Sequence, residues 1–406
     1  MNGIRLLLLV CLTGCIKYNV NGTLPRIYAI ADRSNSRVLL FNGSPSNGQL
    51  PSVVLGQPDF VSNTANSGGI SASTLNFPDA VVSDGIHVVV SDSSNNRILI
   101  WNSIPKINDQ PADVVIGQSN FTSSSANAGG TTAANTLSFP IDLALVGGRL
   151  YVVDRLNQRV LIYNSLPATN FKNADLVLGQ PNFTSNGVAD SATGMRGPQD
   201  VSSDGAHLFV SNWNGNKIQI WNEIPSYNQQ PADIVVLQPS FSSILCGWYP
   251  GGSGAPTAYG ECGGGATVAC SGALISDDFS YNRVLIWNSI PQTNGQPANI
   301  VLGQPDMTHS TANNTPGAAG TVSSQSLNGP NGVSCWGRKL FVSDTGNNRV
   351  LVWNSLPTVN QQPADQVIGQ PNFSSNSSSV TPTGLNASWG FFDNVDFFGI
   401  NRPGGY

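Results

Sequence analysis

Five side chains that carry oxygen atoms occupy the same or the preceding position of a recurring phrase, where they could bind a cation. The phrase reads FPDAVV, FPIDLA, GPQDVS, GPNGVS and FDNVDF, and it supplies Asp79, Asp142, Asp200, Asn331 and Asn394. Carboxylate and amide oxygens are the ligands that Ca²⁺ takes in proteins. If the phrases meet in space, Asp142, Asp200 and Asn394 are the candidate calcium ligands, with Asp79 and Asn331 one position earlier. The alternative is a water-filled polar channel in which the aspartates cap local turns.

A second group of residues lies in one segment, SFSSILCGWYPGGSGAPTAYGECGGG, which holds three aromatic residues between two cysteines. We expect Cys246 and Cys262 to form a disulfide that holds Trp248, Tyr249 and Tyr259 on an exposed loop. Exposed aromatic side chains of this kind suit the recognition of a glycan or a protein.

Other residues that could do chemistry are sparse. Three histidines are scattered along the chain, and no HExxH, GxSxG or P-loop pattern occurs. The net charge is -5 and there is no run of Lys or Arg, which argues against a nucleic-acid partner, because such a partner needs a basic stripe.

The elements that must position these residues come from a unit that occurs six times. A basic anchor recurs every 58 to 66 residues, at Arg37, Arg97, Arg159, Lys217, Arg283 and Arg349. Five residues before each anchor stand Asp32, Asp92, Asp154, Asn212, Asp278 and Asp344, and an aromatic residue follows four residues after it. A long, nearly fixed period indicates a repeat architecture. Because every unit needs the same turn and packing, we interpret these residues as structural.

Each unit contains four short apolar runs. In the second unit they are Asp79–Asp84, His87–Asp92, Arg97–Asn102 and Ala112–Gln118, rich in Val and Ile and bounded by Gly, Pro, Asn and Ser. These runs predict strands, and four short strands per unit predict a propeller blade.

The ends of the chain indicate how the ring closes. The first repeat begins at Arg26–Asp32, which matches the second run of a unit, and Asn394–Gly399 matches the first run. The sequence therefore predicts an all-β, six-bladed β-propeller with four antiparallel strands per blade, in which the C-terminal strand completes the first blade and removes the open sheet edges.

The phrases LFVSDTGNNRVLVWN (Leu340–Asn354) and LYVVDRLNQRVLIYN (Leu150–Asn164) resemble the NHL repeat, and the resemblance runs from about Arg26 to Gly399. It implies a propeller fold. It does not imply one activity, because the family includes ligand-, protein- and RNA-binding modules and a few enzymes.

Long connectors join the fourth strand of each unit to the first strand of the next. They are rich in Ser, Thr, Asn, Gly and Ala, and they span about 60–76, 121–138, 183–196, 241–265, 307–329 and 373–390. In a propeller they lie on one face, together with the turns between the second and third strands. Two interpretations remain open, a binding surface and plain solvated loops.

The N-terminus MNGIRLLLLVCLTGC has one Arg, a short apolar run and a Leu-Thr-Gly-Cys end, which resembles a bacterial lipobox. The resemblance implies a signal peptide at 1–14, lipid on Cys15, a tether at 15–25 and a propeller at 26–406. An ordinary signal peptide is the alternative. Cys270 and Cys335 would then be in an oxidising compartment, either paired or as buried thiols.

We therefore expect a monomeric, lipid-anchored protein of a bacterial cell envelope, at the outer membrane or cell surface, that binds a protein or glycan through its long-loop face without a cofactor. The alternative is a calcium-dependent hydrolase, resembling lactonases, or a lyase, working at the channel mouth.

Overall fold

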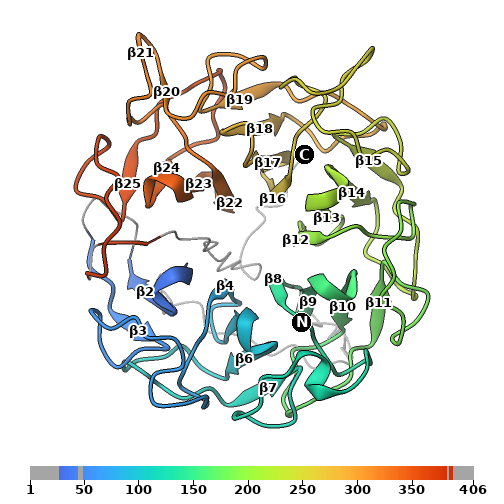
Figure 1. Cartoon of the computed structure of the whole chain (residues 1–406), viewed down its shortest axis with the longest axis vertical. Coiled ribbons are helices and arrows are strands. Elements are labelled where there is room, and N and C mark those ends of the chain that lie inside the picture. Colours follow the sequence, from blue (N-terminus) through green and yellow to red (C-terminus); the bar gives the residue numbers. More distant parts are fainter. Residues whose placement is uncertain (1–26, 44–48, 382–383, 387–406) are drawn as a thin grey trace, which may run out of the picture.

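The computed structural model describes residues 27–43, 49–381 and 384–386, and these residues form a ring of six β-sheets around a central axis (Figure 1). Blade 1 has β1 (Ile27–Asp32), β2 (Arg37–Asn42) and β3 (Val53–Leu55); blade 2 has β4 (Pro78–Ser83), β5 (Val88–Asp92), β6 (Arg97–Trp101) and β7 (Val114–Ile116); blade 3 has β8 (Pro140–Val146), β9 (Arg149–Asp154), β10 (Arg159–Tyr163) and β11 (Leu176–Leu178). Blade 4 has β12 (Pro198–Ser203), β13 (Leu208–Asn212), β14 (Lys217–Trp221) and β15 (Ile234–Val236); blade 5 has β16 (Gly264–Cys270), β17 (Ala273–Asp278), β18 (Arg283–Trp287) and β19 (Ile300–Leu302); blade 6 has β22 (Pro330–Trp336), β23 (Lys339–Asp344), β24 (Arg349–Trp353) and β25 (Gln366–Ile368).

Within blades 2 to 6, four antiparallel strands follow the sequence order from the axis outward. Strands β4, β8, β12, β16 and β22 surround the centre, and β7, β11, β15, β19 and β25 lie at the perimeter (Figure 1). The structure confirms the all-β, six-bladed propeller. The strand expected to close blade 1, Asn394–Gly399, lies outside the described residues. No helix in the described part of the chain is long and apolar enough to span a membrane.

Blades 6 and 1 pack directly on each other, so the ring is complete around the axis. Phe41 of blade 1 lies in one buried cluster with Val352 and Ile368 of blade 6. Other strand-three aromatics fill equivalent gaps: Trp101 packs between blades 1 and 2, and Trp221 between blades 3 and 4. The Trp101 indole N–H also donates to the Gln110 carbonyl at 2.9 Å, which fixes the loop between β6 and β7 to strand β6.

The repeated Asp and Arg form a buried bracket that holds two connectors. In blade 2 the Nε of Arg97 lies 2.7 Å from Oδ2 of Asp92, and both side chains are fully buried. Arg97 also donates to the carbonyls of Ser71 and Thr74, in the connector that enters the blade, and to that of Phe121, in the connector that leaves it. The pair therefore neutralises its own charge and satisfies loop carbonyls, which supports a structural role.

Blade 4 divides this task between two side chains. Lys217 donates to the Phe241 carbonyl of the departing connector, while Gln219 donates to two carbonyls of the entering connector at 3.1 and 3.2 Å. Asn212, in place of the usual Asp, donates to the Gln219 side chain at 3.0 Å. The departure from the repeat at Asn212 and Lys217 is thus compensated locally and preserves the same loop arrangement.

Candidate functional site at the channel mouth

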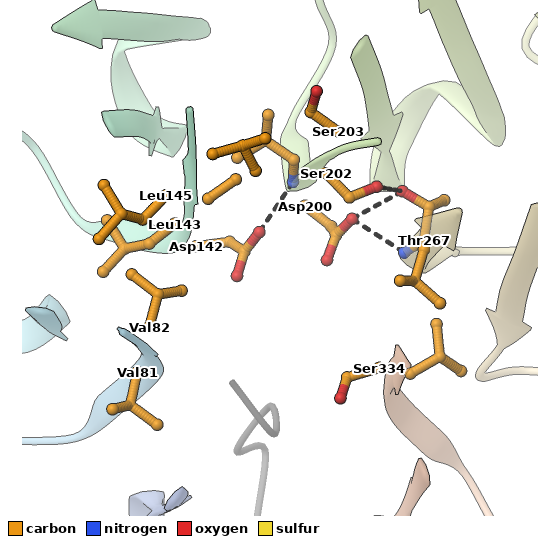
Figure 2. Close-up of a pocket in the computed structure, with 15 residues that line it drawn as sticks. Val81, Val82, Asp142, Leu143, Leu145, Asp200, Ser202, Ser203, Thr267 and Ser334 are labelled. Carbon is orange, nitrogen blue, oxygen red and sulfur yellow. Dashed lines mark hydrogen bonds between the residues drawn. The ribbon is translucent and has the colours of Figure 1, made fainter. Parts of the chain in front are cut away.

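The five predicted channel residues fall into three groups. Asp142 on β8 and Asp200 on β12 lie side by side on the channel wall (Figure 2). Asp79 on β4 and Asn331 on β22 stand one position earlier in their strands, and both are fully buried. Asn394 lies outside the described residues.

Asp142 and Asp200 each cap a backbone N–H of the next blade. Oδ2 of Asp142 accepts from the Val201 amide at 2.8 Å, and Oδ2 of Asp200 accepts from the amide and hydroxyl of Thr267 at 2.8 and 2.7 Å (Figure 2). The amides of Val201 and Thr267 belong to innermost strands. The two carboxyls therefore tie blades 3, 4 and 5 together around the axis.

The same two carboxyls have raised pKa values. Burial raises the pKa of Asp142 well above its usual range, and the neighbouring charge of Asp200 raises it further. Burial also raises the pKa of Asp200, to about 7, although the hydrogen bonds from Thr267 act in the opposite direction. Two carboxyls this close cannot both ionise readily, so ionisation of one opposes ionisation of the other.

The cavity beside this pair is small. It measures about 50 Å³ and its wall includes Asp142, Asp200, Thr267, Val333 and Ser334. Such a volume holds a few water molecules, whereas pockets for drug-sized ligands measure about 300–1,000 Å³. This cavity is therefore a water-sized space with both apolar and polar walls rather than a substrate pocket.

For calcium, the structure places two of the three proposed ligands together. Ca²⁺ takes about six to eight oxygen ligands, and nowhere in the described ranges do three His, Cys, Asp or Glu side chains gather in a metal-binding arrangement. The histidines are engaged separately: His87, His207 and His309 each contact the Asp three residues earlier, at 2.7 to 2.8 Å.

One position of the repeat, which we call the rim position, was not singled out from the sequence. It is the residue directly after the strand-two Asp or Asn, and its type differs around the ring: Arg33, Ser93, Arg155, Trp213, Phe279 and Thr345. Ser93 and Thr345 are buried, and the four large side chains are partly buried. Arg33 contacts Asp79 at 2.5 Å, and Arg155 donates to the side-chain oxygen of Gln199 at 2.7 Å. Two planar polar pairs therefore stand at the mouth on the side of blades 1 to 4.

Aromatic rings occupy the same rim on the side of blades 4 and 5. Trp213 and Phe279 lie with ring centroids 5.5 Å apart and planes tilted by 52°, and both side chains are partly buried. Glycines make room for them, since a Cβ at Gly263 would lie 3.3 Å from the Trp213 ring and one at Gly329 would lie 3.1 Å from the Phe279 ring.

Phe77 occupies the position that matches these glycines in blade 2. It keeps the left-handed backbone conformation, with φ at 52°, that Gly263 and Gly329 also have. A bulky residue rarely adopts this conformation. The guanidinium of Arg33 lies 4.8 Å from the Phe77 ring centroid, so cation–π stacking joins the two rim residues.

Several buried polar groups near the axis have no hydrogen-bond partner among the described residues. They include Oδ2 of Asp277 and both side-chain amide atoms of Asn331. Asp277 stands where blades 2, 4 and 6 have Ser, and its carboxyl fills the space that a side chain at Gly265 would need. Burial raises the pKa of Asp277 well above its usual range, and the charge of Asp200 adds to the effect.

Glu261 departs most sharply from the repeat. Leu75, Leu137, Met195 and Leu327 stand at its position in other units, and all are buried. Glu261 is equally buried, and no side-chain hydrogen bond joins either carboxyl oxygen to a described residue. Burial raises its pKa well above the usual range, as do the charges of Asp278 and Asp277, while Arg283 acts in the opposite direction. Comparing the six units position by position would reveal both Glu261 and Asp277, although not their burial.

The loop aromatics are less exposed than predicted. Trp248, Tyr249 and Tyr259 are all partly buried, and Trp248 meets Tyr259 edge-on at 5.8 Å. The Tyr249 ring lies against Gly252 of its own loop, whereas the Trp248 ring lies against Gly295 in the loop between β18 and β19. On this segment the exposed apolar side chains are those of Ile244 and Leu245.

Two disulfides are present. Cys246–Cys262 confirms the predicted pairing. Cys270–Cys335 joins β16 to β22 and resolves the alternative of buried thiols. Two disulfides in one chain are typical of proteins in oxidising compartments.

The connectors are anchored to the turns they cover. Asn66 in one connector exchanges two side-chain hydrogen bonds with Asn95 of the blade 2 turn, at 2.8 and 3.0 Å. Asn313 and Asn347 form the same exchange in blade 6, at 2.7 and 3.2 Å. These connectors and the strand-two/strand-three turns together form one ordered surface, which we call the loop face.

Comparisons with known proteins add little beyond this geometry. No family model and no curated protein sequence matches the chain, so the likeness to NHL repeats depends on the quoted motifs. Among solved structures, the chain is similar to U3-55K, with 10% identity and a TM-score of 0.38, over 72% of this chain and 63% of that chain. It is also similar to the computationally designed Ika8 protein, with 8% identity and a TM-score of 0.41, over 84% and 83% of the two chains. The fold assignment and the functional argument do not depend on these matches.

Proposed function

We propose that this chain is a recognition module that binds its ligand on the loop face. The observation that carries the proposal is the variation of one rim position in an otherwise regular repeat. The Asp before this position and the anchor after it repeat with one compensated exception, whereas the rim residue itself is Arg33, Ser93, Arg155, Trp213, Phe279 or Thr345.

This variation is informative because the fold does not require it. Turn geometry and connector contacts are supplied by the repeated Asp, Asn and Arg, so one small polar residue would serve at all six rim positions. In repeat proteins the unit-specific residues of one face commonly form the binding surface. Large side chains at four of the six positions, held beside the channel mouth, fit that role.

The channel acids support this assignment over a hydrolase. Asp142 and Asp200 use their oxygens to cap Val201 and Thr267, and the adjoining cavity of about 50 Å³ is too small for most substrates. The acids therefore fit a role in holding the blades together.

We place the protein outside the cytoplasm, held to a membrane by lipid on Cys15. The Leu-Thr-Gly-Cys motif supports the anchor, and the disulfides support an oxidising compartment. Labelled fatty acid should be incorporated into the wild-type chain and not into Cys15→Ala. Equal labelling of the two chains would contradict the anchor without affecting the binding proposal.

Variants on the loop face and on the opposite face of the propeller test the binding proposal. The full chain, reconstituted in liposomes, is exposed to extracellular material of its host, and retained proteins and glycans are both identified. We expect Trp213→Ala/Phe279→Ala to lose the retained material and Arg149→Gln to keep it, since Arg149 begins β9 at the opposite end of the blade. Retention that depends on Arg149 instead would place the site on the other face.

A further inference from the structure

We infer that the ligand of the loop face is a carbohydrate, bound with one sugar ring at the channel mouth beside Trp213 and Phe279; this inference rests on the proposed function. Three properties of the mouth carry it: an aromatic pair, planar polar groups beside it, and the limited depth of the channel.

The aromatic pair is built as a platform. Its two rings come from neighbouring blades, lie 5.5 Å apart and are only partly buried. Gly263 and Gly329 leave the space that the rings occupy. The C–H face of a pyranose packs on aromatic rings at low entropic cost, because neither partner has to lose much internal freedom.

The guanidinium groups at the mouth match sugar hydroxyls. Arg33 and Arg155 are partly exposed, and the buried side chains of Asp79 and Gln199 hold them in fixed planes. Below them, no described residue pairs with Nε2 of Gln199 or with the amide atoms of Asn331. A sugar hydroxyl at the mouth can accept from the guanidiniums, and a bridging water can supply the buried groups with partners.

The channel sets the depth of the site. A cavity of about 50 Å³ below the rim admits water and no sugar ring. The ring must therefore rest at the mouth, with the remainder of a longer glycan running over the connectors. The Ser-, Thr- and Asn-rich composition of those connectors suits such contacts.

A protein ligand fits this face less well. Protein interfaces depend on a desolvated central cluster of apolar anchors. Apart from the neighbours Ile244 and Leu245, the exposed large apolar side chains of the loop face belong to separate units, as with Val61, Leu156 and Val188. Among the residues that the structure describes, the large apolar side chains near the channel mouth are the rim aromatics and Phe77.

A glycan array and purified oligosaccharides test the inference. The full chain in liposomes is applied to an array of bacterial, plant and animal oligosaccharides, and the affinity of each hit is measured for four variants. We expect Trp213→Ala and Phe279→Ala to weaken binding by about tenfold or more. Trp213→Phe, which keeps an aromatic ring, should retain most of the affinity, and Arg149→Gln should retain all of it.

Thermal unfolding of each variant separates loss of the site from loss of the fold. If Trp213→Ala lowers the melting temperature strongly, the oligosaccharide affinities of Trp213→Phe and Phe279→Ala are compared instead to test the site. The inference is overturned if no oligosaccharide binds, or if binding persists undiminished in both alanine variants. A third outcome is that no glycan on the array binds, while the liposome experiment retains a protein through Trp213 and Phe279. That outcome would overturn the carbohydrate assignment and leave the proposed function standing.

Discussion

The carboxyl of Asp142 in blade 3 lies beside the carboxyl of Asp200 in blade 4, and both are buried in the channel wall (Figure 2). Burial and the closeness of the second carboxyl raise the pKa of Asp142 in the folded state, and burial raises that of Asp200. The arrangement links the stability of the propeller to pH, because in the unfolded chain both carboxyls lose their protons at lower pH.

Replacing Asp142 with Asn should stabilise the protein at alkaline pH. Both carboxyls have pKa values raised above 3.8, so their contribution is complete at low pH and is lost as the pH rises toward about 7 and above. Asn keeps an acceptor for the Val201 amide and needs no proton. We expect wild type and Asp142→Asn to unfold alike near pH 3.5, below the unfolded-state pKa of 3.8, and the variant to gain about 1–3 kcal/mol at pH 8.

Thermal unfolding at both pH values provides the measurement. Asp142→Ala is the control, since it leaves the Val201 amide without its acceptor and should lower the melting temperature at either pH. Parallel stability curves for wild type and Asp142→Asn from about pH 3.5 to 8 would argue against a raised pKa of Asp142 in the folded state.

Glu261→Leu should also stabilise the fold. It restores the residue type of the other units and removes a buried carboxyl that makes no hydrogen bond. The expected gain is about 1–3 kcal/mol at neutral pH. It should increase with pH, because the raised pKa of Glu261 makes the folded state lose stability as the pH rises.

Chemical denaturation measures this gain. The matched control is Leu75→Glu in blade 2, which creates the same situation where the repeat has Leu and should destabilise strongly. If Glu261→Leu lowers the free energy of unfolding as much as Leu75→Glu does, the Glu261 carboxyl makes a stabilising contact in the folded protein.

Arg97→Ala should cost more stability than Lys217→Ala. Removing Arg97 leaves the buried Asp92 charge unpaired and frees the Ser71 and Thr74 carbonyls, at a cost of about 3–5 kcal/mol. In blade 4 the partner Asn212 is neutral and Gln219 keeps its two carbonyls, so Lys217→Ala should cost about 1–2 kcal/mol. Urea unfolding compares the two variants. Equal losses in free energy of unfolding would show that Lys217 and Gln219 do not divide the role that Arg97 has in blade 2.

Both disulfides should be found by non-reducing peptide mapping, and the longer loop should contribute more. The separations are 16 residues for Cys246–Cys262 and 65 for Cys270–Cys335. Chain entropy then gives roughly 3 and roughly 4 kcal/mol. Replacing each cysteine pair with Ser and measuring the loss in free energy of unfolding tests which disulfide contributes more. A Cys246 peptide linked to Cys335 would contradict the pairing.

The sequence alone determined the blades. The Asp, the anchor and the aromatic act within one unit over a few residues, so their spacing encodes the turn and the strand directly, and six copies predict six blades. The Cys246–Cys262 pairing was also accessible, because the two residues flank one short loop. Column-by-column comparison of the units would have indicated that Glu261 and Asp277 are unusual.

The site was decided by the tertiary structure, because its contacts cross between blades. Asp142 reaches Asp200, Trp213 reaches Phe279, and Cys270 reaches Cys335 only when the ring sets how far one blade is rotated and displaced from the next. Equivalent sequence positions show that such residues face the same axis. Sequence positions alone do not show which carboxyls lie side by side, which rings meet, or which buried polar atoms lack a partner. Those relationships depend on the packing of neighbouring strands.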